Sequence, residues 1–264
     1  MLTAVKNQIK ISLLSVKYAL QREMLNKVTF FSNIIFMIIN NGCFLVQWII
    51  LYALKDGIGG YSFKQILLLW GLAAGTFGFS HFFFKNSYGL SSAINEGRLD
   101  NYLVQPKNVL ISMITSNVDV SAIGDILYGY IMIAIYGISI KSFLLFTLFM
   151  ISGGIILTSV AVMWGSLAFW FGKVDMVANT MNGLPTSFAT YPDGIFKGFI
   201  KILYYTIIPI GFSSYIPIHI ITDFNIYYLF VVLSITVIFV ILAFLIFYKG
   251  LKKYSSSNLM NVRV

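Results

Sequence analysis

Two long stretches without any charged side chain restrict the fold of this chain more than any other feature. Residues 142–172 and 226–248 contain no Asp, Glu, Lys or Arg. A helix of about 20 apolar residues crosses the hydrocarbon core of a bilayer. Because lipid offers the backbone no hydrogen-bonding partner, a segment inside it must be helical or part of a closed barrel. The two stretches therefore predict membrane-spanning helices.

Composition extends this prediction to the whole chain. Of the 264 residues, 58% are hydrophobic and 10% are charged, whereas roughly a quarter are charged in an average soluble domain. We expect one all-α membrane domain over residues 1–264. No GxxxxGK[ST] phosphate-binding loop occurs, so ATP hydrolysis would need a separate chain. The net charge of +9 comes mostly from lysines that flank apolar runs, which favours membrane topology and lipid headgroups over nucleic acid.

The apolar runs divide the chain into six expected spans. Five are clear, and the remaining one is either 176–192 or 202–222. The clear runs are 28–54, 65–84, 118–140, 142–172 and 226–248.

Lys and Arg are enriched in cytoplasmic loops, so their count tests the alternatives. They divide nine to nine if both ambiguous runs cross, 13 to 5 if only 176–192 crosses, and 15 to 3 if only 202–222 crosses. The charge bias favours six spans with both termini in the cytoplasm. Pro209 and Pro217 cut the later run into short pieces, so we favour 176–192 as the fifth span.

The N-terminal segment, residues 1–27, predicts an amphipathic helix. Its apolar residues recur at spacings of three or four, and lysines follow one edge of that stripe. This pattern is typical of a helix in the membrane interface, although a helix packed on protein would also produce it. The stripe comprises Leu2, Val5, Ile9, Leu13, Val16 and Leu20, and the edge comprises Lys6, Lys10 and Lys17.

The longest polar insert is residues 85–110, which the predicted topology places in the cytoplasm. Its centre runs from Glu96 through Gly97 to Pro106 and predicts a turn into a short helix that the proline ends. An ordinary solvated loop is the alternative reading.

A few polar residues interrupt the expected spans. Asn33, Asn40 and Asn41, with Gln47, could line a pathway, although packing between helices is the simpler explanation. The carboxylates Asp119 and Asp125 lie near the start of the third span. Intramembrane charges are functional candidates. Both carboxylates are within about two helical turns of the interface, however, so we favour shallow, hydrated or paired groups.

No catalytic constellation is visible in the sequence. The histidines His81 and His219 have no ligand partners at helical spacing, so we expect no metal site. We also expect no enzymatic residues on this chain.

Three motifs resemble those of membrane permeases of type-2 ABC exporters, in particular a bacterial subgroup. EGRLDNYLVQP (96–106) follows the second expected span. YPDGIF (191–196) and IPIGFSSYIP (208–217) precede the last span, and GLKKYSSS (250–257) follows it. The resemblance covers residues from about 20 to 257.

The resemblance implies a permease subunit that forms a substrate pathway with a second permease, identical or paralogous. ATP and Mg would bind a separate dimer of ABC ATPases, and this chain would carry no cofactor. The protein would be a multi-pass component of the bacterial inner membrane, in contact with lipids. The rival interpretation is a secondary transporter or channel without an ATPase, for which we would expect charges at mid-membrane or an inverted repeat.

The resemblance also assigns roles to two segments. A coupling helix would contact the ATPase through Glu96, Arg98, Leu99, Asp100, Tyr102, Leu103 and Pro106. Among these, Leu99, Tyr102 and Leu103 would form an apolar plug, and Arg98 and Asp100 would fix its register. Re-entrant half-helices over 193–222 would form an exit gate with Tyr191, Pro192, Ile195, Phe196, Pro209, Phe212, Tyr215 and Pro217.

Overall fold

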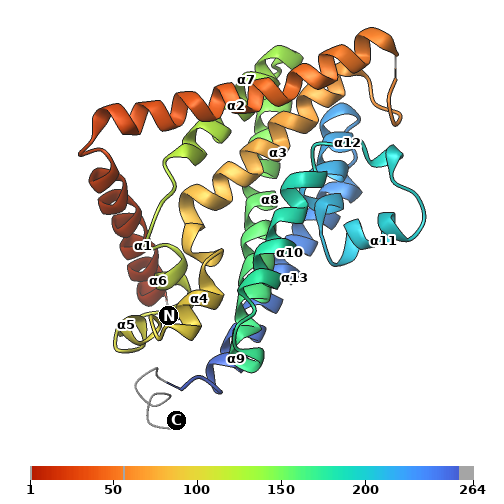
Figure 1. Cartoon of the computed structure of the whole chain (residues 1–264). Coiled ribbons are helices and arrows are strands. Elements are labelled where there is room, and N and C mark those ends of the chain that lie inside the picture. The colour runs from red at the N-terminus through yellow and green to blue at the C-terminus, as the bar shows by residue number, and fades with distance from the viewer. Residues whose placement is uncertain (1, 56, 256–264) are drawn as a thin grey trace.

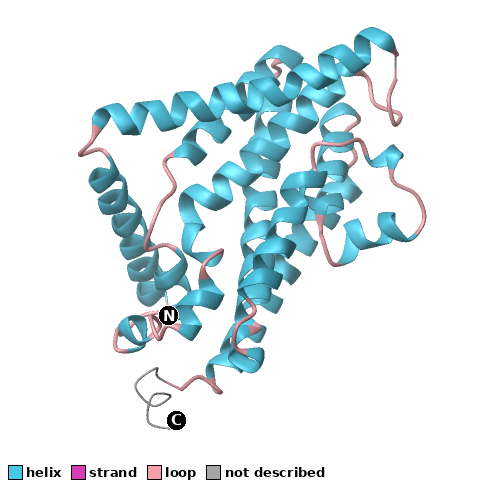
Figure 2. Cartoon of the chain, viewed as in Figure 1, coloured by secondary structure: helices cyan, strands magenta, loops and turns pink. Residues whose placement is uncertain are grey.

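The computed structural model describes residues 2–55 and 57–255. Helices make up nearly all of this part of the chain, and it contains no β-strand (Figure 2). One isolated bridge between Ile58 and Tyr61 closes a turn. The expectation of an all-α fold is therefore confirmed.

The bundle is built from helices that run across the molecule (Figure 1). They are α2 (Lys27–Leu54), α3 (Phe63–Phe84), α7 (Ser121–Gly137), α8 (Ile140–Ser166), α10 (Asp175–Phe188) and α13 (Ile226–Leu251).

One side, called the α5 side, carries the N-terminal helix and several short helices. These are α1 (Leu2–Glu23), α4 (Leu90–Asn95), α5 (Asp100–Leu103), α6 (Val109–Ile114) and α9 (Ala168–Phe171), with the end of α13 beside them. The other side, called the α11 side, carries the 57–62 loop, η2 (Asp193–Ile195), α11 (Phe199–Thr206) and the end of α12 (Ile216–Thr222).

Within the described residues, four helical stretches are long and apolar enough to span a membrane: α2, Phe63–Asn95 (α3 to α4), Ile140–Phe171 (α8 with α9) and α13. The bent pair Phe199–Thr206 and Gly211–Thr222 would be a fifth if it forms one span. This agrees with a multi-pass membrane protein. Helix α7 is apolar but has only 17 residues, which is shorter than the expected run 118–140. Its start is delayed because Asp119 accepts hydrogen bonds from the backbone and hydroxyl of Ser121. It ends at Gly137, whose φ of +128° is incompatible with a continued helix.

Two further helices also differ from the expected ranges. The run 142–172 is broken near Leu167 into α8 and the short α9. Helix α10 has 14 residues, fewer than the expected 176–192, and contains Pro185 in its last turn. Proline removes a backbone donor, and α10 ends three residues after it.

Glycines bring α3 and α7 into close contact. A Cβ atom placed on Gly129 would lie 2.7 Å from the carbonyl oxygen of Gly71, and one on Gly71 would lie 2.5 Å from Cβ of Met132. Small residues at helix crossings allow this approach in membrane proteins. Helices α3 and α8 form the centre of the bundle and bury many side chains, whereas α2 and α13 bury few.

Helix α1 lies along the outside of the bundle and turns sharply into α2 (Figure 1). Its apolar residues Val5, Ile9 and Leu13 are 53%, 55% and 58% exposed. The side chain of Gln8 holds α1 to the neighbouring segment, because it donates to Ser112 Oγ at 3.2 Å and accepts from the Asn108 backbone at 3.0 Å. Val16 of the same stripe is buried in a cluster with Val118, so the stripe is exposed only in part, and its contact with lipid stays a prediction.

Basic residues divide unequally between the two sides. The α5 side has twelve in the described part of the chain, and the α11 side has five. The larger group is Lys6, Lys10, Lys17, Arg22, Lys27, Lys85, Arg98, Lys107, Lys173, Lys249, Lys252 and Lys253, and the smaller is Lys55, Lys64, Lys141, Lys197 and Lys201.

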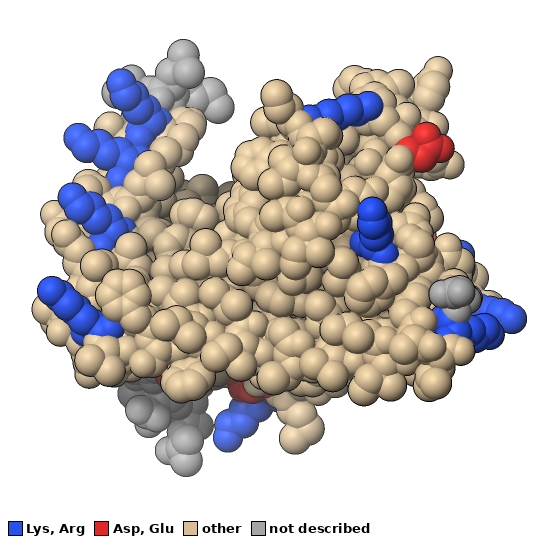
Figure 3. Space-filling model, turned by 90° about the horizontal axis from the view of Figure 1, so that it is seen from above, with Lys and Arg blue, Asp and Glu red and all other residues tan. Residues whose placement is uncertain are grey.

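Which of the runs 176–192 and 202–222 crosses the membrane stays a prediction. The remaining basic residue, at position 263, lies outside the described residues. Seen from above, a broad uncharged region separates the row of basic side chains at the left from those at the right (Figure 3).

Candidate functional site

A cavity of about 450 Å³ lies among α2, α3, α10 and the π-helical turn η3 (Gly211–Tyr215), with one lining residue each from α7 and α8. We call it the intrabundle cavity. Its lining combines many polar groups with four aromatic rings. The polar residues are Asn40, Asn41, Gln47, Thr76, Asp125, Thr186, Ser187, Thr190, Ser213 and Ser214, and the aromatic residues are Phe44, Trp70, Phe77 and Tyr191.

Asp125, on α7, is the one charged residue in this lining. It is 4% exposed, and its Oδ1 accepts a hydrogen bond of 2.6 Å from Nδ2 of Asn41 on α2. Its Oδ2 is buried without a hydrogen-bonding partner. A carboxylate away from water normally pairs with a cation or several donors, so this group has unused capacity to accept hydrogen bonds.

Two glycines place Asp125 between α2 and α3. On α3, a Cβ atom at Gly78 would lie 2.8 Å from Cβ of Asp125. On α7, a Cβ atom at Gly124 would lie 2.5 Å from the carbonyl oxygen of Ile34. Because neither glycine has a side chain, α7 fits close to both neighbouring helices and brings Asp125 to Asn41.

Further buried polar groups lie around the cavity. Thr76 Oγ1 and Trp70 Nε1 are buried and have no hydrogen-bonding partner. The rings of Phe44 and Trp70 stack, with their centroids 6.1 Å apart and an interplanar angle of 18°. The lining can therefore contact an apolar body and also exchange hydrogen bonds with a polar group.

The cavity opens between α2 and α10. Asn40 and Phe44 on α2 and Thr186 and Ser187 on α10 are exposed, and all four line it. Its wall on that flank is incomplete in the single chain.

The structure brings together part of the polar set singled out in the sequence. Asn40, Asn41 and Gln47 line the cavity, whereas Asn33 is exposed on α2 and lies outside the lining. Of the alternatives considered for Asp125, the structure shows a paired group, which is hydrogen-bonded to Asn41 and buried instead of hydrated. Asp119 lies outside the cavity and forms a 3.3 Å ion pair with Lys85.

The segment 96–106, with α5 at its centre, lies on the α5 side. Gly97 has a φ of +73° and forms the turn that follows α4. Beyond it, Arg98 pairs with Glu96 at 2.8 Å, with both side chains exposed. Helix α5 covers Asp100–Leu103 and ends before Pro106, as the proline predicts.

Leu99 does not occupy the position expected of an apolar plug. It is 0% exposed and lies in a core cluster with Leu110, Met113 and Phe247. The cause is the turn at Gly97, after which Leu99 packs into the chain's own interior. Exposed apolar surface is instead found at Leu103, which is 41% exposed, and at Val104, which is 84% exposed.

Two hydroxyl groups tie this segment to other elements. Tyr102 donates to Ser116 Oγ at 2.9 Å, and Tyr254, which follows α13, donates to Asp100 Oδ1 at 2.9 Å. Burial and the hydrogen bond to Asp100 raise the pKa of Tyr254 above its ordinary value. Asp100 therefore accepts a hydrogen bond from Tyr254 within the chain, so its role is not limited to contact with a partner.

The segment 193–222 is bent between its two helical parts. Helix α11 and the continuous helical stretch Gly211–Thr222 meet at a bend of 73°. Pro209 precedes η3 and Pro217 lies in the first turn of α12, so the prolines stand at helix starts, where their missing donors cost little. An ion pair of 3.3 Å between Asp193 and Lys201 holds the beginning of the segment together.

The expected gate residues cluster around the end of α10. The Tyr215 hydroxyl donates to the carbonyl of Phe188 at 3.1 Å. The ring of Phe196 packs edge-on against Phe188 and Tyr204, and Phe212 packs edge-on against Tyr205. Tyr191 lines the cavity, and Ile195 is 45% exposed. Pro192 lies close to the 57–62 loop, because a Cβ atom on Gly59 would be 2.8 Å from Cβ of Pro192.

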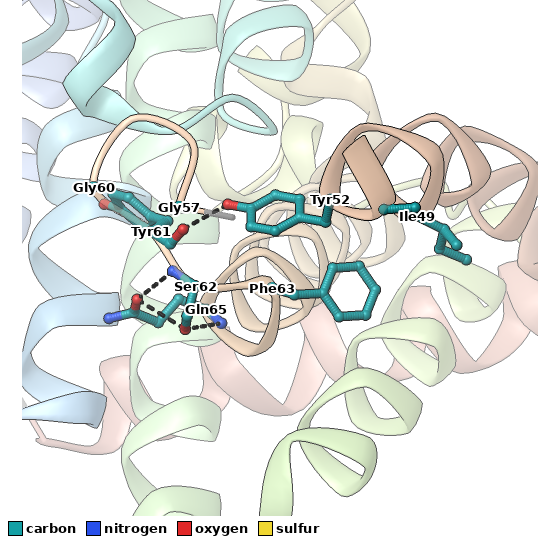
Figure 4. A pocket seen from close by; sticks show the side chains of 9 residues that line it. Ile49, Tyr52, Gly57, Gly60, Tyr61, Ser62, Phe63 and Gln65 are labelled. Atoms are coloured by element: carbon teal, nitrogen blue, oxygen red, sulfur yellow. Dashed lines mark hydrogen bonds between the residues drawn. The ribbon is translucent and has the colours of Figure 1, made fainter. Parts of the chain in front are cut away.

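A second hollow of about 660 Å³ lies near the 57–62 loop (Figure 4). The Tyr52 hydroxyl donates to the carbonyl oxygen of Tyr61 at 2.6 Å. Ser62 and Gln65 form a capping box at the start of α3. These contacts shape the loop and begin the helix, which explains them without a ligand. Across residues 2–55 and 57–255, no group of three or more potential metal ligands is found.

The intrabundle cavity and the segment 96–106 both lie in the part of the chain that matches a known family. Residues 23–258 match the model of the ABC-2 family transporter protein. Neither the curated proteins nor the solved structures include a match to this chain. Because the match covers most of the 264 residues and confirms the resemblance seen in the three motifs, this chain belongs to the ABC-2 transporter family and is a membrane permease of an ABC transporter.

Proposed function

We propose that this chain is the permease subunit of an ATP-driven exporter in the cell membrane. It works with a separate ABC ATPase dimer, which binds ATP and Mg, and with a second permease. The observation that carries the proposal is the exposed apolar pair Leu103 and Val104 at the tip of the α5 side, within a family whose members work with an ABC ATPase. Exposed apolar residues on a short helix suit insertion into a partner's groove.

The contacts of α5 suggest how movement passes from the ATPase into the bundle. Leu99 lies in one core cluster with residues of α6 and with Phe247 of α13, and Tyr254, which follows α13, donates to Asp100. Tyr102 connects α5 to Ser116, just before α7. A displacement of α5 therefore acts on α6, α7 and α13 together, because packed contacts transmit rigid-body shifts.

The second permease covers the open flank of the intrabundle cavity, between α2 and α10. Phe44 and Tyr191 are 52% and 38% exposed there and could contact a partner. The 73° bend and the position of 193–222 support a re-entrant segment that enters from the outer face and returns. Six spans with cytoplasmic termini complete the proposed topology.

Substitution of the exposed apolar pair tests the ATPase contact. The tagged permease is purified from its native membranes, and the ATP hydrolysis that copurifies with it is measured. We expect the double variant Leu103→Asp, Val104→Asp to lose about tenfold or more of this activity, because charges remove an apolar anchor. The control variant Leu103→Met, Val104→Ile keeps an apolar tip and should retain the activity. Equal ATP hydrolysis in both variants would place the contact elsewhere.

A secondary transporter is the second candidate, because Asp125 is the kind of buried carboxylate such proteins use. Transport in vesicles that contain only this chain separates the two. ATP-independent uptake driven by an ion gradient would favour the secondary transporter, and transport only when ATP and the copurified ATPase are both supplied would favour the exporter.

A further inference from the structure

We propose that the intrabundle cavity binds an ammonium group carried on an apolar body, with Asp125 and Asn41 receiving the ammonium. The inference rests on the proposed function in one respect: the molecule bound in the cavity would be the molecule that the permease transports. Binding itself needs neither the ATPase nor the second permease.

The charge of the cavity lining indicates that the ligand is a cation. Asp125 is the one carboxylic acid in it, and the lining contains no Lys, Arg or His. One oxygen of Asp125 is satisfied by Asn41, and the other is buried without a partner. An N–H donor with a positive charge supplies both the missing hydrogen bond and the missing counter-charge. A phosphate or carboxylate ligand would instead meet like charge.

The shape and surface of the cavity fit the rest of such a molecule. Its volume of about 450 Å³ lies within the range of drug-sized ligand sites. The stacked rings of Phe44 and Trp70 form an apolar wall, and aromatic faces also attract cations. The unpartnered hydroxyl of Thr76 can accept a further hydrogen bond from an ammonium group.

A metal ion fits this site less well. The lining provides one carboxylate and no His or Cys, whereas metal sites collect several charged or imidazole ligands. One carboxylate with an amide and hydroxyl neighbours is better matched to a single organic cation.

The test compares two probes that share an aromatic body and differ in whether the amine at its end is charged or acetylated. Dansylcadaverine carries a primary ammonium on an aromatic body, and its N-acetyl derivative has the same body without the charge. Binding to the full chain in an uncharged maltoside detergent is followed by dansyl fluorescence. We expect the wild type to bind the amine about 10- to 100-fold more tightly than the acetylated probe, as a charge-assisted hydrogen bond implies. Equal affinities would overturn the proposal.

Substitutions locate the site. Asp125→Asn should reduce affinity for the amine to that for the acetylated probe, whereas Asp119→Asn, six residues away and outside the cavity, should leave it unchanged. Since Asp125→Asn also alters a buried contact, a second variant is placed at the exposed cavity wall. Asn40→Lys should weaken amine binding by adding a competing ammonium, and Asn40→Gln should not. Unchanged binding in both Asp125→Asn and Asn40→Lys would overturn the assignment.

The ammonium group could belong to a free amine or to an aminophospholipid. Phosphatidylethanolamine is added as a competitor, with phosphatidylglycerol as the control lipid. If phosphatidylethanolamine competes and phosphatidylglycerol does not, the site binds aminolipid headgroups as well as amines. If neither lipid competes, the site binds free amines. The variant Leu103→Asp, Val104→Asp, which changes no residue of the cavity lining, should bind the amine as the wild type does even where copurifying ATP hydrolysis is lost, so loss of amine binding and loss of ATPase association are separable results.

Discussion

Gly78 shows how one missing side chain determines the position of the candidate site. A Cβ atom there would lie 2.7 Å from the carbonyl oxygen of Ala122, 2.8 Å from Cβ of Asp125 and 2.9 Å from the backbone nitrogen of Ile126. Two of these atoms belong to the backbone of α7, which cannot move aside as a side chain can.

We expect Gly78→Ala to destabilise the folded chain by about 1–3 kcal/mol, because an added methyl group overpacks the α3–α7 crossing. Gly42→Ala on α2 is the matched control, since nothing lies within 4 Å of the Cβ atom it adds. That control should be neutral or more stable by about 0.5–1 kcal/mol. Denaturant unfolding of the purified protein in detergent measures both. Similar losses in the two variants would show that the crossing is not closely packed.

At the residue scale, the sequence predicted which residues take part in the candidate site better than it predicted what surrounds each of them. It singled out Asn40, Asn41 and Asp125, but the pairing of Asn41 with Asp125 joins positions 84 residues apart, which no local pattern specifies. The burial of Leu99 was also missed. Its direction depends on the turn at Gly97 and on α13, which lies more than a hundred residues later in the chain.

At the element scale, α1 makes a specific prediction about the membrane interface. Its exposed apolar stripe lies between the surface packed on protein and the edge that carries Lys6, Lys10 and Lys17. An environment-sensitive fluorophore attached at Ile9→Cys should show blue-shifted emission in vesicles and be quenched by lipids labelled near the headgroup. The same label at Asn7→Cys should report water.

Both α1 variants require replacement of the single cysteine, Cys43, which is exposed on α2. A label at Ile9→Cys that reports water in vesicles would mean that the exposed stripe is covered by protein or left in solvent.

The helix ranges also show what limits prediction of elements. For α2 and α13, the apolar runs 28–54 and 226–248 lie within or close to the helices, because lipid-facing segments are continuous in hydropathy. Helices α7 and α10 are shorter than their runs. Their ends depend on the turn at Asp119, on the positive φ of Gly137 and on Pro185. A hydropathy profile contains no information on such backbone effects.

At the scale of the whole molecule, the two-sided arrangement predicts the result of cysteine labelling in intact cells. In a chain with Cys43→Ala, a membrane-impermeant maleimide added outside should modify Lys197→Cys on the α11 side and not Lys107→Cys on the α5 side. The expectation follows from the excess of basic residues on the α5 side, which is typical of the cytoplasmic face. Labelling of the residue 197 variant only after cell disruption would contradict both the topology and the re-entrant segment.

The charge count was the strongest sequence argument at this scale, because it depends on composition and not on packing. It favoured one crossing between positions 176 and 222, and this stays a prediction, because α10 has only 14 residues and the bent pair of helices over 199–222 is a span only if its two parts act as one. The cavity could not be predicted in the same way. It is formed by six separate elements whose mutual positions come from tertiary packing.

The hydrogen bonds of Gln8 have a mechanical consequence for the whole assembly. They fasten α1 to Asn108 and Ser112, directly after the segment that carries Leu103 and Val104. Any tilting of that segment must either carry α1 with it or break two hydrogen bonds, each worth about 1 kcal/mol. With 22 residues, α1 is an arm about 33 Å long. If α1 lies in the membrane interface, its movement displaces lipid. A stiffer bilayer would then oppose the tilting of this segment and slow the transport cycle.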